Sequence, residues 1–172
     1  ADEHAVAAMV DRCREQFGAL HYAFNNDGIV GAGAPIADMP VEVWDRGIGV
    51  MLRGVFLSMK FEIPLILESG GGAIVNTSSG AGIIGFPNMA NDGAAKHGGS
   101  GLSKTAALEY ATKGIRINSI CPGTARSRMV EEWLSSDTNG EEMVNGLHPI
   151  GQIAAPDEVV AASLLRSAAS AG

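Results

Sequence analysis

Three side chains near the middle of the chain could do acid/base chemistry together. Ser79 follows a short apolar segment, and Asp92 and Lys96 stand four residues apart. A spacing of four places two side chains on one face of a helix. A hydroxyl, a carboxylate and an ammonium that converge could hold an oxygen atom and move a proton. The same residues also allow a surface ion pair between Asp92 and Lys96, beside a serine that only caps a turn.

Three other kinds of site receive little support. The four histidines do not have the spacing of metal ligands. Residues 80–85 fit G-x-G-x-x-G, but Pro87 interrupts the approach to the next helix, so we do not assign a pyrophosphate site there. Residues 98–102 nearly match the G-x-S-x-G turn of hydrolases, but Leu102 replaces the last glycine and the segment lies within a predicted helix.

Helices and strands that alternate along the chain must position these side chains. Apolar residues at helical spacing predict helices over residues 6–17, 41–68, 90–112, 129–134 and 157–168. Short apolar runs predict buried strands over residues 20–24, 73–77 and 115–121. Pro64 is expected to bend or interrupt the last turns of the second helix.

The alternating order predicts the fold class. Strands joined by helices form right-handed βαβ units, which give a parallel sheet with helices on both faces. Ligands of such sheets bind beyond the carboxyl ends of the strands. These ends fall at residues 25–28, 78–82 and 122–127, and all three are rich in glycine and small polar residues. We therefore expect an α/β fold with one site at this edge of the sheet.

Composition and charge narrow the classes of partner. The chain has 172 residues, of which 46% are hydrophobic, and a net charge of −7, so nucleic acid and anionic membranes are not expected as partners. No apolar run is long enough to cross a membrane, and the first residues do not resemble a secretory signal. Cys13 and Cys121 lie among apolar residues and are expected to be reduced, as in a cytoplasmic protein.

Four segments resemble, in the right order, the motifs of the short-chain dehydrogenase/reductase family. They match its strand with the N-N-A-G turn, its serine-bearing strand, its active-site helix and its strand that ends in Pro-Gly, at residues 20–28, 71–79, 95–102 and 114–123. The resemblance spans residues 1–165 without a gap. It implies hydride transfer between NAD or NADP and the carbon of a small secondary alcohol or ketone.

The resemblance also implies a role for each catalytic position. Ser79 takes the place of the serine that hydrogen-bonds the reacting oxygen, and Lys96 that of the lysine that holds the nicotinamide ribose. Asp92 stands where the family has its tyrosine acid/base. Met51 stands where the family has the asparagine that anchors a relay water. The chain is therefore expected to be impaired as an enzyme.

Cofactor contacts implied by the resemblance lie at the strand ends. The residues are Asn25, Asn26, Gly28, Lys96, Pro122, Gly123, Thr124 and Ser127. Two positions depart from the family pattern, because Asp27 replaces an alanine and Ser127 replaces the usual threonine.

The resemblance further implies that residues 1–172 are the C-terminal part of a single domain. This part lacks the glycine-rich N-terminal half and the last strand, so the fold is a partial doubly wound, Rossmann-type sheet that retains three strands with flanking helices. Because the phosphate-binding turn belongs to the other part, we expect this chain alone to bind NAD or NADP very weakly.

The predicted helices over residues 41–68 and 90–112 resemble those that form dimers in the family, so we expect a homo-oligomer. Val55, Met59, Leu102 and Ala106 are the candidates for an outward apolar stripe, and the alternative is that they face their own sheet. Asp92 and Met51 leave two further functions open. Beside the dehydrogenase, the alternatives are a non-catalytic binding or assembly module and a decayed copy without a role, the latter favoured by Gly47, Gly93 and Gly99.

Overall fold

A three-stranded parallel sheet forms the centre of the protein. The structure is a computed structural model that describes residues 1–29, 33–134 and 140–168. The strands, in the spatial order β1-β2-β3, are β1 (Tyr22–Asn25), β2 (Gly72–Thr77) and β3 (Ile115–Ile120). The register pairs Asn25 with Asn76, and Asn76 with Ser119, so the carboxyl ends of all three strands meet at one edge. The predicted α/β fold with three parallel strands is confirmed.

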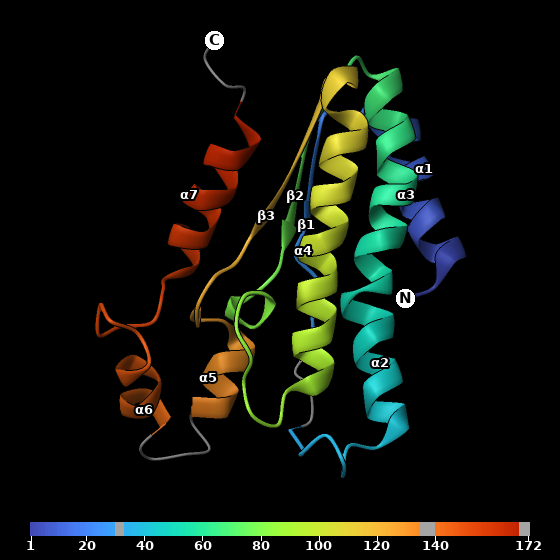
Figure 1. Cartoon of the computed structure of the whole chain (residues 1–172). Coiled ribbons are helices and arrows are strands. Elements are labelled where there is room, and N and C mark those ends of the chain that lie inside the picture. The colour runs from blue at the N-terminus through green and yellow to red at the C-terminus, as the bar shows by residue number, and fades with distance from the viewer. Residues whose placement is uncertain (30–32, 135–139, 169–172) are drawn as a thin grey trace.

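Helices cover both faces of the sheet (Figure 1). One face carries α1 (Glu3–Phe17), α2 (Val41–Met51), α3 (Arg53–Glu68) and α4 (Ala90–Tyr110). The opposite face carries α7 (Pro156–Ser167), while α5 (Arg128–Leu134) and α6 (Gly140–Gly146) lie beyond the carboxyl ends of the strands. Short 3₁₀ turns, η1 (Gly80–Gly82) and η2 (Ala111–Lys113), complete the described elements.

The first helix is longer than its apolar pattern predicts, because a cap precedes that pattern. The Asp2 carboxylate accepts a hydrogen bond from the Ala5 amide at 2.8 Å, so α1 begins at Glu3. At the other end, Gly18 adopts a left-handed conformation and donates its amide to the Arg14 carbonyl. Local capping chemistry therefore sets both ends of α1.

The main core lies between the sheet and the helices α3 and α4. Its buried residues are Val55, Met59, Ile63, Ile66, Ile74, Ala106, Ile115 and Ile117. The prediction that Val55, Met59, Leu102 and Ala106 form an outward stripe is therefore wrong, because the first, second and fourth are buried against their own sheet and Leu102 is partly buried against the same core. The exposed apolar residues on these two helices are Phe56, Leu67 and Leu108 instead.

The helical stretch after residue 40 is interrupted at Leu52. The prediction that Pro64 interrupts it is wrong. Leu52 has a φ of −108°, and its side chain packs so closely on α4 that a Cβ at Gly98 would lie 2.9 Å from it. α3 continues through Pro64 to Glu68. Pro64 is exposed, so the backbone carbonyl that loses its hydrogen bond there can bind water. Contact between helices thus decides where the chain departs from helical geometry.

Other features agree with the sequence or add to it. Cys13 and Cys121 are free thiols that are half-buried. Within the described ranges, no helix has the length and apolar character needed to cross a membrane. The sequence did not predict α6, a short helix with glycine at both ends that packs through Val144 on Leu134 and Ile153.

Candidate active site

Two backbone hydrogen bonds tie together the segments that follow β2 and β3. The Ser78 amide donates to the Ile120 carbonyl, and the Gly80 amide donates to the Pro122 carbonyl, both at 2.8 Å. The structure thus brings the predicted serine segment and the Pro-Gly segment side by side at the carboxyl edge of the sheet.

Serine hydroxyls fasten α4 to the end of β2. Ser100 donates to the Ser78 hydroxyl, which in turn donates to the Lys96 carbonyl, each at 2.9 Å. A Cβ at Gly82 would lie 2.1 Å from the Ser78 oxygen and 3.0 Å from the Lys96 carbonyl oxygen, so only glycine fits there. This close packing fixes the first turns of α4 against the strand end.

Ser79 is half-buried next to this contact and acts first as a cap. Its hydroxyl oxygen accepts a hydrogen bond from the Ala81 amide at 3.1 Å and so begins the turn η1. A hydroxyl has one proton to donate as well, and the described residues give this proton no acceptor. Ser79 can therefore cap the turn and still donate to an oxygen atom of a ligand.

Lys96 extends from α4 to the end of β2. Its ammonium group donates to the Thr77 carbonyl at 3.1 Å, which uses one of its three protons. Burial lowers the pKa of Lys96, while the charges of Asp92, Asp27 and Cys121 partly offset this effect. The side chain is thus held at the strand edge with donors left for a ligand.

Asp92 lies one helical turn before Lys96 and is buried, with 8% of its surface exposed. Burial raises the pKa of Asp92, and the charge of Lys96 offsets only part of that rise. The charge of Lys96 alone would lower the pKa of this carboxyl, but burial outweighs that attraction. The alternative of a surface ion pair fails, since the described residues show no ion pair between them.

The sequence missed Asn91, which fastens the start of α4 to α2. Asn91 is buried; it accepts from the Asp92 amide at 2.9 Å and donates to the Val43 carbonyl at 3.4 Å. A Cβ at Gly47 would lie 2.9 Å from the Asn91 amide nitrogen, so the glycine makes room for this side chain. Met51 ends α2 and is buried, and its thioether is at most a weak hydrogen-bond acceptor.

A second buried polar group lies deeper under the same edge. The Asn25 side-chain amide donates to Glu62 at 3.0 Å and to Asn76 at 2.9 Å. Asn76 donates in turn to the Ser103 hydroxyl at 2.9 Å and to the Met59 sulfur at 3.2 Å. Burial raises the pKa of Glu62, and the hydrogen bond from Asn25 partly lowers it. We call Asn25, Glu62, Asn76, Ser103 and Met59 the interior network.

The interior network changes what Asn25 can contribute. Its amide group points into the fold, so any contact of Asn25 with a cofactor must come from its backbone or its remaining carbonyl oxygen. Asn26 and Gly28, which follow, are exposed at the edge. Sequence reasoning missed Glu62 and Asn76, although a charge within the apolar run at residues 61–66 was an available signal.

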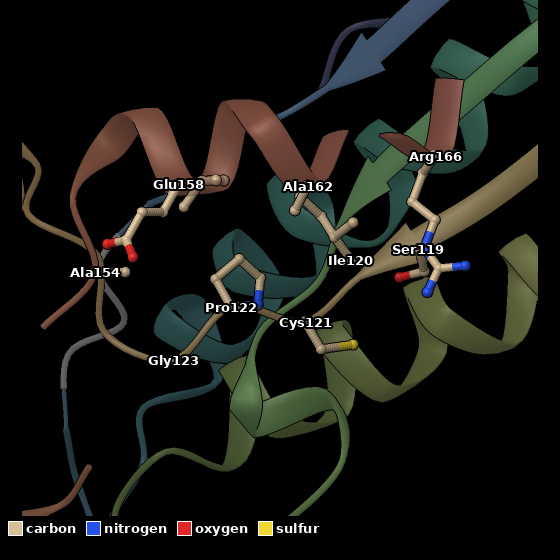
Figure 2. A pocket seen from close by; sticks show the side chains of 10 residues that line it. Ser119, Ile120, Cys121, Pro122, Gly123, Ala154, Glu158, Ala162 and Arg166 are labelled. Atoms are coloured by element: carbon tan, nitrogen blue, oxygen red, sulfur yellow. The ribbon is translucent and has the colours of Figure 1, made fainter. Parts of the chain in front are cut away.

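The segment after β3 borders a groove of about 390 Å³ under α7 (Figure 2). Pro122 and Gly123, two predicted cofactor residues, line it from the loop, while Glu158, Ala162 and Arg166 line it from α7. Thr124 lies next to the groove. Ser127 is exposed, and its hydroxyl accepts from the Val130 amide at 3.3 Å at the start of α5.

Comparison with known proteins identifies the family. The model of the family described as Enoyl-(Acyl carrier protein) reductase matches residues 1–171. Cyclohexanol dehydrogenase of Acinetobacter sp. (strain SE19) is 49% identical over 99% of this chain and 66% of its own length. The 2,5-dichloro-2,5-cyclohexadiene-1,4-diol dehydrogenase of Sphingobium indicum (strain DSM 16413 / CCM 7287 / MTCC 6362 / UT26 / NBRC 101211 / UT26S) is 39% identical, over 99% of this chain and 69% of its own.

A solved structure supports the same family assignment. ElxO with NADP bound superimposes with a TM-score of 0.92 and 27% identity, over 99% of this chain and 68% of its own. The chain belongs to the short-chain dehydrogenase/reductase family, whose members are NAD(P)-dependent oxidoreductases. It spans about two thirds of the length of these relatives.

Proposed function

We propose that the site is the nicotinamide- and substrate-side part of an NAD(P)-dependent alcohol dehydrogenase site. The observation that carries this proposal is the Lys96 ammonium, held at 3.1 Å from the Thr77 carbonyl beside Ser79. In this site Ser79 donates to the substrate oxygen, Lys96 holds the nicotinamide ribose, and Asp92 occupies the acid/base position. The family resemblance supports these assignments residue by residue.

The residues present fit one end of the cofactor better than the other. Two of the three N–H donors of Lys96 have no acceptor among the described residues, and such donors suit ribose hydroxyl groups. When bound, NAD or NADP supplies the hydride acceptor or donor. The glycine segment at residues 80–85 forms a 3₁₀ turn, and α4 begins only at Ala90, so no helix terminus faces a pyrophosphate there. We therefore expect weak cofactor binding.

The substrate is proposed to be a secondary alcohol or ketone on a carbon ring. Both dehydrogenases compared above are named for six-membered ring alcohols. In this chain, exposed apolar side chains follow Ser79 along the chain and offer a surface for such a ring. They are Ile83, Ile84, Phe86 and Met89.

Proton transfer is proposed to be impaired in this chain. The Asp92 carboxyl is shorter than a tyrosine side chain, so it reaches less far toward a substrate oxygen. Met51 cannot hold a relay water as a carboxamide can. A non-catalytic binding module is the second candidate, and these same two residues favour it.

Titration calorimetry of the chain with millimolar NAD(H) or NADP(H) tests the cofactor part of the proposal. We expect very weak binding, because the residues around Lys96 would hold the nicotinamide end alone. A Lys96→Met variant is the matched control, and any binding seen with the wild type should disappear. Micromolar affinity would contradict the proposed division of the site.

Pairing with a second copy of the chain is proposed through α3 and α4. A groove of about 450 Å³ lies between these helices, and its lining includes Phe56, Leu67 and Glu109. Sedimentation equilibrium should show a dimer that Phe56→Glu weakens and that Met9→Glu, an exposed change on α1, leaves intact. A wild-type monomer at high concentration would contradict this pairing.

A further inference from the structure

His148 follows α6 and contacts the Pro-Gly segment through its ring. Its Nε2 atom accepts a hydrogen bond from the Thr124 amide at 3.0 Å. Its Nδ1 atom lies 2.8 Å from the Val144 carbonyl oxygen. The ring is half-buried and bridges the end of α6 to the residue after Gly123.

These two partners select one tautomer of the ring. A carbonyl oxygen only accepts, so Nδ1 must carry a proton in order to bond to Val144. A backbone amide only donates, so Nε2 must be without a proton in order to bond to Thr124. The two hydrogen bonds therefore require the tautomer with its proton on Nδ1 and a lone pair on Nε2.

Close packing against Gly123 fixes the ring in a second way. A Cβ at Gly123 would lie 2.6 Å from Nε2 and 3.0 Å from Cδ2 of His148. Gly123 does not adopt a left-handed conformation, so backbone strain does not require a glycine at this position. The close approach of the His148 ring does require one. Gly123 and His148, 25 residues apart, therefore fit each other in shape.

The Thr124 peptide is held from the other side as well. Its carbonyl accepts from the Ala154 amide at 2.9 Å, and the Arg126 amide donates to the Ala154 carbonyl at 2.9 Å. Ala125 and Ala154 form an isolated parallel bridge between these bonds. Among the described hydrogen bonds of Thr124, the one that its amide donates to His148 has a side chain as its acceptor, so substitution can remove it selectively.

We propose that His148 is a positioning residue that sets the conformation of the Gly123–Thr124 segment through its Nδ1-protonated ring. The positioning rests on the two hydrogen bonds of the ring, and only its consequence for a cofactor rests on the proposed function, if Gly123 and Thr124 contact the nicotinamide as the family resemblance implies. His148 touches no reacting atom and acts through the Thr124 amide.

Two variants separate the two hydrogen bonds of the ring. His148→Gln keeps an acceptor near the position of Nε2, whereas His148→Asn keeps a donor near Nδ1 and loses the distal acceptor. Hydrogen exchange at the Thr124 amide should stay slow in the wild type and in His148→Gln. It should be about fivefold faster in His148→Asn, which is the usual worth of one hydrogen bond.

Two further measurements complete the test. Nitrogen-15 spectra of the wild-type ring should show the proton on Nδ1. The Gly18 amide, which bonds to Arg14 at the far end of α1, serves as the control for an intact fold. If His148→Asn does not fold, Gly123→Ala should displace the ring and speed exchange at Thr124 instead. A proton on Nε2, or equal Thr124 exchange in both His148 variants, would overturn the proposal.

Titration with NADH and NADPH distinguishes this proposal from the proposed function. Perturbation of the Thr124 amide by either nucleotide in the wild type, reduced in His148→Asn, supports both. If neither nucleotide perturbs the wild-type protein while the exchange results hold, His148 keeps its positioning role and the proposed function fails.

Discussion

Two buried carboxyl groups lie under the same edge of the sheet and differ in how they are satisfied. Glu62 accepts a hydrogen bond from Asn25 and belongs to the interior network. The Asp92 carboxylate has no hydrogen bond or ion pair among the described residues, and the hydrogen bond from Asp92 to the Asn91 side chain is donated by the backbone amide. Burial raises the pKa of both groups. The difference indicates that Glu62 is part of the scaffold, whereas Asp92 remains available to a ligand.

The helices around the two carboxyl groups show the same contrast. The interior network joins α3, β1, β2 and α4 through side-chain hydrogen bonds. At the start of α4, the fit is one of shape, because Gly47 makes room for Asn91. The stability of the interior network should therefore depend on charge and hydrogen bonding. The stability of the start of α4 should depend on side-chain volume.

The largest expected effect concerns Asp92 as the acid/base. A chimera that supplies the rest of the length of cyclohexanol dehydrogenase should show no measurable turnover with Asp92 and Met51 in place. Asp92→Tyr with Met51→Asn should restore activity by about 10²–10⁴-fold, which is the usual contribution of a positioned acid/base group. The measurement is nicotinamide absorbance against a panel of secondary alcohols and ketones.

Asp92→Asn in the same chimera is the control, and it should not restore activity, since a carboxamide neither gives nor takes the proton. Burial raises the pKa of Asp92 and so favours its protonated form, but the short side chain still limits its reach. Robust turnover with Asp92 unchanged would show that the assignment is wrong and that the two carboxyl groups differ in another way.

The next effect concerns the fit between Gly47 and Asn91. Gly47→Ala should lower the free energy of unfolding by about 1–3 kcal/mol, because its Cβ would overlap the Asn91 side chain. In an Asn91→Ala background the same change should raise it by up to about 1 kcal/mol, since alanine favours a helix more than glycine does. Denaturant unfolding of the four proteins measures this. An unchanged sign in the two backgrounds would refute the proposed fit.

The smallest expected effect concerns the charge of Glu62. Because burial raises the folded pKa above its ordinary value of 4.5, the folded protein holds this proton more tightly than the unfolded chain does. Its contribution to stability is therefore present at low pH and is lost as pH rises from about that value through the raised pKa. Glu62→Gln keeps an acceptor for Asn25 and removes the charge.

The free energy of unfolding of Glu62→Gln, relative to the wild type, should thus increase with pH above 4.5 and level off once the pH exceeds the raised pKa of Glu62. Glu68→Gln, an exposed change on the same helix, is the matched control and should show no such rise. A pH-independent difference for Glu62→Gln would mean that folding does not raise the pKa of Glu62. The comparison of Glu62 with Asp92 as two buried carboxyl groups would then fail.

The sequence by itself determined the parallel sheet and the residues that follow its strands. Apolar runs and helical spacing are local patterns, so they predicted three strands in the right places and the long helices of the first face. The four-residue spacing of Asp92 and Lys96 and the segment with Ser79 were likewise readable, because each lies at the end or start of one element. Asp2 could have extended α1 to its observed start, since capping is also local.

Only the tertiary structure decided the environment of these side chains. The pKa of Asp92 rises because other elements bury it, whereas the charge of Lys96, one turn along the same helix, would by itself lower it. Asn25 turns inward because Glu62, 37 residues away, offers an acceptor. Contacts with distant residues also place Val55 in the core and hold the ring of His148 against Thr124. Burial and hydrogen bonding depend on contacts between distant segments, and a pattern within one segment does not contain them.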